Sequence, residues 1–367
     1  MTARSAKQCA RVGAATAIAI AVATLTACTA SGEAPVVQPS STPAADAGRT
    51  GDEELLRAVG NTFGDEHDRA AVALVDGDDV RTAFVNADAS TMFELGPITK
   101  ALTGLLLADA IERGEVALDD PVGTHLALEG SDAASATLEQ LSTHHSGLPP
   151  WPSDPAWASD FDAALAANED AIGDDDDVVA QAAAEDLPAE TGFENSYLGS
   201  ALLGLALAAA AGTDYRSLLE ARVFEPAGMS SAVLVETEDD VPEQHAGGYS
   251  IDGSTVEPWT FGEYAPAAGV AATIDDMSAL ARSVLDGPFR DSAALEPVVE
   301  LDDRFSIGYQ WALEKLASRT VTGQEGGTGG FSSMLLIDRT AGTASIVLWN
   351  APGDAYEVAL RMLPLAE

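Results

Sequence analysis

The chain has 367 residues, of which 46% are apolar and 6% aromatic, and 59 acidic residues against 18 basic ones give a formal charge of −41. This apolar fraction is sufficient for a large buried core, which excludes a wholly disordered chain. The acidity argues against nucleic-acid binding and against electrostatic attachment to an anionic membrane, because both need clustered Lys and Arg. Two cysteines cannot form a disulfide framework.

The N-terminal segment has the pattern of an export signal. Arg4, Lys7 and Arg11 precede an uncharged apolar run over residues 12–27, which is shorter than the roughly 20 residues of a membrane span. The run ends in Leu-Thr-Ala-Cys at residues 25–28, which resembles the bacterial lipoprotein signal. That resemblance implies removal of residues 1–27 and lipid attachment at Cys28, which would hold the protein on the outer face of the cell membrane.

A plain secretory peptide that is cut near Ala27 or Ala30 is the alternative to a lipoprotein signal. Residues 28–52 are rich in Pro, Ser, Thr and Ala, a composition that predicts a solvated tether. We therefore expect a single folded domain over residues 53–367.

The first part of this domain predicts two strands and a long helix. Residues 71–75 form a short apolar run, 76–79 an acidic turn with one glycine, and 80–85 a returning strand. A helix is expected from Pro97 to about Arg113, because Leu102, Leu105, Leu106 and Ile111 share one face. Gly114 is suited to end it.

The rest of the chain divides into a helical, loop-rich middle and a strand-rich end. We expect helices over about 115–285, strands at 305–312, 318–322, 331–337 and 344–349, a hairpin turn at 338–342 and a last helix near 354–364. The predicted fold is mixed α/β (α+β), with one antiparallel sheet built from both chain ends, flanking helices and an inserted helical region. The acidic run 174–177 lacks the ligand spacing of a calcium loop and is interpreted as a solvated loop.

Five segments resemble the serine β-lactamase and penicillin-binding-protein superfamily, in its class C β-lactamase, D-alanyl-D-alanine carboxypeptidase and esterase branch. Residues 93–100 read Phe-Glu-Leu-Gly-Pro-Ile-Thr-Lys, similar to Phe-x-x-(Gly/Ala)-Ser-x-x-Lys. Similar segments follow in the family's order at 118–122, 137–148, 224–229 and 326–333. The resemblance implies the β-lactamase/transpeptidase-like fold over roughly 55–365.

The family's chemistry is acyl transfer through a serine ester, and this sequence departs from it at each reactive position. Pro97 stands at the serine position, Phe193 replaces the Tyr of Tyr-x-Asn, and Gln324 replaces the Lys or His of Lys/His-x-Gly. Lys100, Asn195 and Gly326 remain. The resemblance therefore implies a remnant site of these six positions, with no cofactor or metal.

Proline at position 97 removes both the attacking hydroxyl and a backbone N–H that the family uses to stabilise the oxyanion. One lost donor of this kind costs about 10²–10³ in rate. The fold should tolerate the change, because proline suits the first position of a helix. The sequence thus predicts a preserved fold that is catalytically impaired or inactive.

Three functions remain open. The first is an envelope lipoprotein that binds a cell-wall peptide, a small acyl ligand or another protein through the old cleft, with Lys100 as either a ligand-binding cation or a relic bonded to Asn195 and Gln324. The second is an active serine-type hydrolase (esterase, carboxypeptidase or β-lactamase-like) with a relocated nucleophile, for which Thr99 and Ser196 are the candidates. The third is a structural lipoprotein whose cleft is filled by its own side chains.

Two further pairs of residues carry weaker hypotheses. Trp151 and Trp157 either line a cleft mouth or cover the core. His144 and His145 are interpreted as loop-supporting residues, because neighbouring histidines point in different directions and no further metal ligand is placed nearby.

Overall fold

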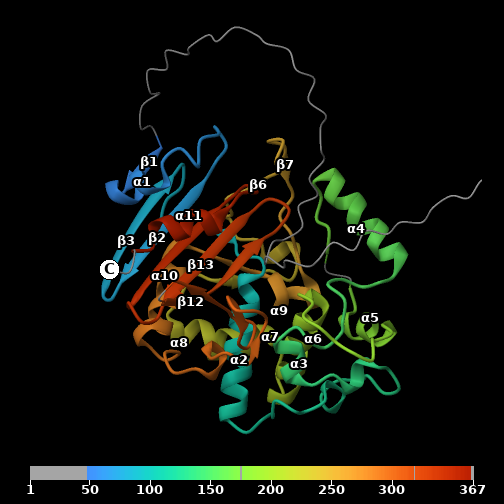
Figure 1. The fold of residues 1–367 in the computed structure, drawn as a ribbon. Coiled ribbons are helices and arrows are strands. Elements are labelled where there is room, and N and C mark those ends of the chain that lie inside the picture. The colour runs from blue at the N-terminus through green and yellow to red at the C-terminus, as the bar shows by residue number, and fades with distance from the viewer. Residues whose placement is uncertain (1–47, 174–175, 318, 365–367) are drawn as a thin grey trace, which may run out of the picture. The chain divides into compact units, whose positions relative to one another are not determined.

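A nine-stranded antiparallel sheet forms the centre of the molecule (Figure 1). The computed structural model describes residues 48–173, 176–317 and 319–364, so the expected signal segment, Cys28 and most of the expected tether lie outside it. The strands lie in the order β1 (Arg49–Gly51), β3 (Asp79–Val85), β2 (Ala70–Asp76), β14 (Thr343–Trp349), β13 (Ser332–Asp338), β12 (Arg319–Gly327), β11 (Ala312–Leu316), β10 (Phe305–Ile307) and β9 (Val299–Glu300). Because β2 pairs with β14, the two chain ends share one sheet, as predicted.

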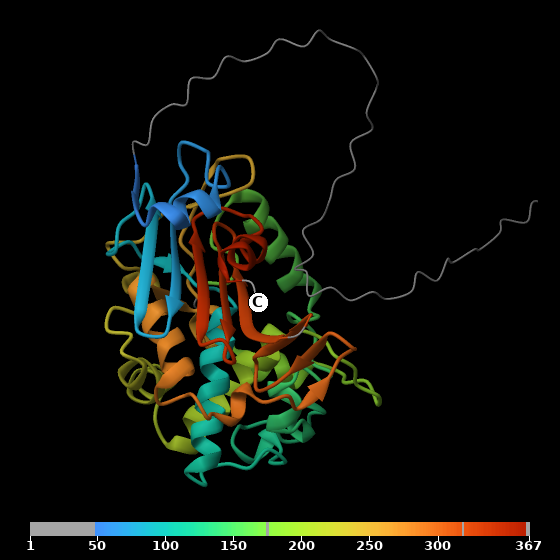
Figure 2. The same ribbon diagram turned by 60° about the vertical axis from the view of Figure 1, so that its left-hand side comes forward.

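Side chains on both faces of this sheet are buried. In β2, Ala71, Ala73 and Val75 belong to one apolar cluster, whereas the alternate residues belong to another, as the two-residue period of a strand requires. Helices α1 (Glu53–Val59) and α11 (Ala355–Met362) cover one face, and α2 (Ile98–Glu112) and α10 (Ile274–Asp286) pack on the other (Figures 1 and 2).

The middle of the chain contains the remaining helices and two small sheets. The helices are α3 (Leu138–Ser142), α4 (Pro155–Ala167), α5 (Val178–Ala184), α6 (Tyr197–Ala211), α7 (Tyr215–Leu219), α8 (Glu225–Ala227) and α9 (Ala265–Ala268). The first small sheet has the order β4 (Phe93–Glu94), β8 (Val270–Ala272) and β5 (Val233–Leu234), and the second is the hairpin β6 (Gly248–Tyr249) and β7 (Thr255–Val256). The region 115–285, which was expected to be helical and loop-rich, therefore contains short strands as well as helices.

Several predicted elements differ in their bounds. The prediction of a single strand at 305–312 is wrong. The chain forms two strands there, β10 and β11, and Gln310, with a φ of 62°, lies between them. Its backbone N–H donates to the carbonyl of Ser142, so tertiary contact turns the chain there. Strand β1 pairs with β3 inside the segment expected to be tether, so the sheet begins by Arg49.

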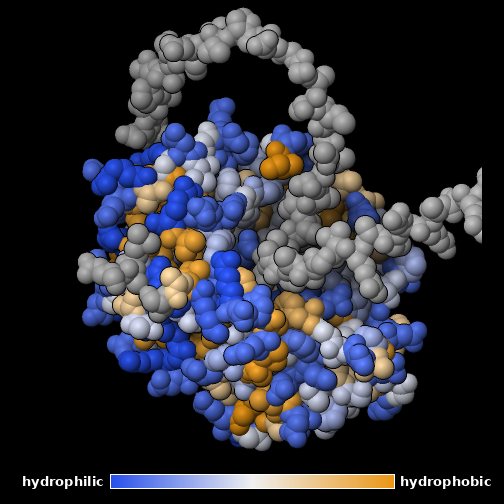
Figure 3. All heavy atoms as spheres, viewed as in Figure 1, coloured by the Kyte–Doolittle hydropathy of each residue, from blue (hydrophilic) through white to orange (hydrophobic). Residues whose placement is uncertain are grey.

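Among the described residues, no single helix is long and apolar enough to cross a membrane. By length and composition alone, the segments Tyr197–Ala211 and Tyr215–Ala227 pass as a pair, with an 82° bend between them. The face of the molecule in Figure 3 is mostly hydrophilic, in keeping with the excess of acidic residues.

Candidate functional site

Pro97 lies immediately before helix α2, where it has the helical dihedral angles φ −56° and ψ −12°. It accepts a hydrogen bond at its carbonyl from the N–H of Lys100 at 3.0 Å. The missing proline N–H would not be bonded within the helix, because the first N–H groups of a helix have no partner there. The predicted helix from Pro97 to Arg113 is therefore confirmed, with proline suited to its start.

Two glycines press the turn before α2 against strand β12. Gly96 has a φ of +53°, and a Cβ added to it would lie 2.8 Å from the carbonyl oxygen of Gly327. A Cβ on Gly326 would lie 2.0 Å from the carbonyl oxygen of Leu95. The retained Gly326 thus permits a close approach of two backbones, which any larger residue would prevent.

Lys100 lies at the bottom of the site and is completely buried. Its Nζ donates to Oδ1 of Asn195 at 2.7 Å and lies 3.7 Å from the ring centre of Tyr197. Burial lowers the pKa of Lys100 to about 7, because the charged form loses its hydration. At neutral pH this amine is therefore divided between its charged and neutral forms.

Phe193 packs against the two neighbouring histidines. Its ring meets His144 at 5.8 Å and His145 at 6.0 Å, both edge to face. Burial, together with the nearby charge of Lys100, holds the pKa of His144 well below its usual value. The Nδ1 of His144 accepts from the N–H of Ser196, and Nδ1 of His145 bonds the carbonyl of Thr143, so both histidines support the loop.

Gln324 and Glu325 stand on β12 beside the Gly326 contact. Among the hydrogen bonds of the described residues, none joins Gln324 to Lys100, so only the Asn195 half of the expected relic arrangement is present. Glu325 is a carboxylate that the sequence did not single out. Burial raises its pKa to about 7, and the charge of Asp354 adds to that shift.

Tyr197 is the residue at this site that sequence reasoning missed. It is the first residue of α6, two positions after Asn195, and burial raises its pKa. The face of its ring meets Nζ of Lys100, a cation–π contact. The phenol missing at Phe193 is therefore not replaced, since no hydrogen bond joins Tyr197 to Lys100 among the described residues. The Tyr is visible in the sequence, but the direction of its ring is not.

An aromatic cluster continues outward from Tyr197. Its ring stacks on Trp151 at 4.2 Å, and Trp151 in turn stacks on Trp157 at 5.7 Å. Phe161 joins both tryptophans at 5.2 and 5.1 Å. Both tryptophans are half-buried. Trp151 packs against the main apolar cluster as well as on Tyr197, which is the core-covering position that was one of the two expectations.

The candidate relocated nucleophiles have structural roles. Oγ1 of Thr99 accepts from the N–H of Val270 at 3.1 Å, and the residue is fully buried. Oγ of Ser196 donates to the carbonyl of Pro149 and accepts from the N–H of Gly199, as an N-cap of α6. Neither hydroxyl is bonded to Lys100.

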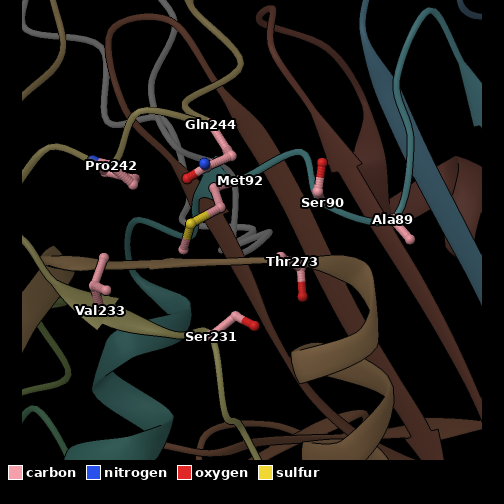
Figure 4. Close-up of a pocket in the computed structure, with 8 residues that line it drawn as sticks. All are labelled: Ala89, Ser90, Met92, Ser231, Val233, Pro242, Gln244 and Thr273. Carbon is pink, nitrogen blue, oxygen red and sulfur yellow. The ribbon is translucent and has the colours of Figure 1, made fainter.

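Two other features of the described chain lack the chemistry of a reactive site. A pocket of about 560 Å³ lies along β4, β5 and β8 (Figure 4) and has no titratable group in its lining, which consists of Ala89, Ser90, Met92, Ser231, Val233, Pro242, Gln244 and Thr273. Possible metal-ligand atoms of Asp65, His67 and Asp68 lie within 4.8 Å of one another. Both oxygens of Asp68 already accept hydrogen bonds, from Asp65 N and Trp349 Nε1.

Comparisons with known proteins place this geometry in context. A protein-family model described as Beta-lactamase matches residues 56–365. Penicillin-binding protein 4 of Amycolatopsis lactamdurans is 26% identical over 312 residues, which are 78% of each chain. A class C beta-lactamase from Rhodobacter sphaeroides has a TM-score of 0.71 at 20% identity, covering 84% of this chain and 97% of its own. Another class C beta-lactamase has a TM-score of 0.72 at 16% identity, covering 86% and 98%.

Proposed function

Because the chain belongs to the Beta-lactamase family, we propose that it is an exported, lipid-anchored member that does not form an acyl-enzyme and acts by non-covalent binding at the cell envelope. The observation that carries this proposal is the environment of Lys100. Three residues before it stands Pro97, and the one hydrogen bond of its side-chain amine among the described residues goes to an amide, Asn195. An amine activates a serine only when the hydroxyl is within hydrogen-bond reach.

The other parts of an acylating site are also replaced. Pro97 has no N–H to stabilise an oxyanion. Phe193 has no hydroxyl to relay a proton, and Tyr197 offers Lys100 its ring face. Thr99 and Ser196 are held by backbone groups. These contacts support a binding role over a hydrolase with a relocated nucleophile.

The burial of Lys100 limits where a ligand makes contact. The amine is covered by Tyr197 and Trp151, so a cell-wall peptide or a small acyl ligand would meet these rings before it met the amine. The structural role among the three expected functions would have the same ring contacts. A binding role therefore needs movement of the cover.

Incubation with a fluorescent penicillin, with p-nitrophenyl esters and with a fluorophosphonate tests the absence of an acyl-enzyme. We expect no adduct by intact mass and no saturable turnover. The matched comparison is the double variant P97S/F193Y, which restores the hydroxyl, the N–H and the phenol. An adduct on the wild-type protein would contradict the proposal.

The lipid anchor is tested separately. We expect the full-length protein to sediment with membranes, and the Cys28→Ala variant to appear in the soluble exported fraction, because two acyl chains are needed for stable anchoring. Membrane association that is unchanged in Cys28→Ala would contradict lipid attachment at this position.

A further inference from the structure

Helix α4 is attached to the molecule by aromatic side chains rather than by a buried face. None of its 13 residues is buried. Trp157 stacks on Trp151, and Phe161, four residues on and on the same face, stacks on Trp157 and is tilted against Trp151. Phe161 and Ala164 also contact the main apolar cluster. In Figure 1, α4 lies at the margin of the molecule, far from the large sheet. Asp154 and Asn168 cap its two ends, so backbone groups at both helix ends have partners within α4 and its caps.

This helix carries the outer end of a row of ring contacts that leads to Lys100. From outside to inside, the contacts run from Trp157 to Trp151 at 5.7 Å and from Trp151 to Tyr197 at 4.2 Å. Tyr197 then lies 3.7 Å from Nζ of Lys100. Displacement of α4 would leave the Trp151 ring without the side chains that stack on its outer side.

Trp157 makes two kinds of contact, one through its ring face and one through its ring N–H. Its ring stacks on Trp151, and its Nε1–H donates to both carboxylate oxygens of Asp176 at 3.0 Å. Asp176 is held in place by Nε2 of Gln181 at 2.6 Å. An aromatic face beside a carboxylate recognises a flat ring that carries a donor on its edge.

We propose that α4 is a displaceable cover and that Trp157 is an internal substitute for a ligand, a planar aromatic ring with an N–H donor on its edge. The proposal rests on the non-covalent role proposed above and names the chemical class of ligand for the same cleft. The ligand replaces Trp157 on Trp151 and donates to Asp176.

The charges around Asp176 favour a donor over an acid. Glu263 accepts from the N–H of Val178, next to Asp177. Burial raises the pKa of Glu263, and the charges of Asp177 and Asp176 raise it further. A ligand that brings a carboxylate to this position would add a like charge to the group, whereas an N–H donor reduces the repulsion.

Amine acylation with acetic anhydride, mapped by mass spectrometry, tests the cover. After residue 27 the sequence has two lysines, Lys100 and the exposed Lys315, so the second is an internal standard. We expect W157A/F161A to raise the acylation rate of Lys100 by at least about tenfold relative to Lys315, the factor for a single aromatic pair, because the two changes remove more than one such pair. Leu165→Ala, at an exposed residue of the same helix, should leave this ratio unchanged.

An unchanged ratio in W157A/F161A would overturn the cover. If near-ultraviolet circular dichroism shows that the double variant is unfolded, Trp157→Phe serves instead, since it keeps a ring and removes the N–H. We then expect a rise of severalfold at Lys100, and a ratio equal to that of wild-type protein would again overturn the cover.

Indole and 1-methylindole test the ligand class, because they differ in the ring N–H. By calorimetry, W157A/F161A should bind indole about tenfold more tightly than 1-methylindole, and Asp176→Ala in that background should abolish the difference. Equal affinities, or no binding of either probe, would overturn the ligand assignment.

The same samples separate this inference from the proposed function. A penicillin adduct would contradict the non-acylating role. Tighter binding of indole than of 1-methylindole would still support the proposed ligand site at Trp151 and Asp176. If the protein bound indole and 1-methylindole equally and formed no penicillin adduct, only the proposed ligand site at Trp151 and Asp176 would be overturned.

Discussion

Helices α2 and α4 have 15 and 13 residues, yet one is enclosed by the protein and the other is attached to its surface. In α2, 12 of the 15 side chains are buried, whereas α4 has no buried side chain. Helix α2 is rich in Leu and α4 in Ala, and both residue types favour helix in either setting. The fold therefore depends on α2 more than on α4, because α2 is buried. Pro97 and Lys100 of the remnant site lie at the start of this buried helix.

This difference explains why the reactive residues can change while the fold remains. Pro97 is at the start of α2, and the helix is held by Leu102, Leu105 and Leu106 in the main apolar cluster. A proline in place of the family's serine at position 97 would remove the attacking hydroxyl without removing any of that buried area. The catalytic and structural contributions of the same helix are thus separable.

The strongest test of the comparison is truncation of one leucine in each helix. We expect Leu106→Ala to lower the free energy of unfolding by about 2–5 kcal/mol, because it leaves a cavity in the core. Leu165→Ala, at 39% exposed, should change it by less than about 0.5 kcal/mol. Urea unfolding measures both, and similar losses would contradict the difference between the helices.

The glycine contact that holds the start of α2 gives the next largest effect. We expect Gly326→Ala to destabilise the protein by roughly 1–3 kcal/mol, because its Cβ would overlap the carbonyl of Leu95. The control is Gly192→Ala, where an added Cβ has no neighbour within 4 Å. Equal melting temperatures of the two variants would show that β12 and the turn move apart without cost.

Lys100 is the one position in α2 where burial opposes folding. Its pKa falls from 10.5 in the unfolded chain to about 7, so the unfolded state binds more protons between these values. Stability should therefore rise as the pH increases from 7 towards 10.5, and fall as it decreases through that window.

Lys100→Met should remove this pH dependence and stabilise the protein at pH 7 by roughly 1–3 kcal/mol, because a buried charge costs more than its one hydrogen bond returns. Urea unfolding at pH 7 and pH 9 measures both effects. A Lys100→Met variant less stable than wild type at pH 7 would mean that the contacts with Asn195 and Tyr197 outweigh desolvation.

The smallest expected effect is at Pro97 itself. Pro97→Ser should change the free energy of unfolding by less than about 1 kcal/mol, since the position is in a helical conformation and needs no N–H partner. Thermal unfolding checks this, and acylation by penicillin should stay absent until Phe193→Tyr is added. A large loss of stability would mean that proline is required by the turn.

The sequence by itself determined the elements with a clear period or a clear end. The long helix after Pro97, the paired strands predicted at 71–75 and 80–85 and observed at 70–76 and 79–85, and the sheet made from both chain ends follow from apolar spacing and turn residues. The six remnant positions could be named from their motifs. Lipid attachment at Cys28 stays a prediction, because it falls outside the described residues.

Only the tertiary structure decided what surrounds Lys100. Tyr197 and Trp151 are separated by 46 positions in the chain, and no local pattern indicates that their rings stack above a buried amine. The break at Gln310 and the pairing of Arg49–Gly51 with β3 likewise depend on contacts between distant segments. Local sequence sets helix and strand preference, whereas burial, ring stacking and the resulting pKa depend on groups that only folding brings together.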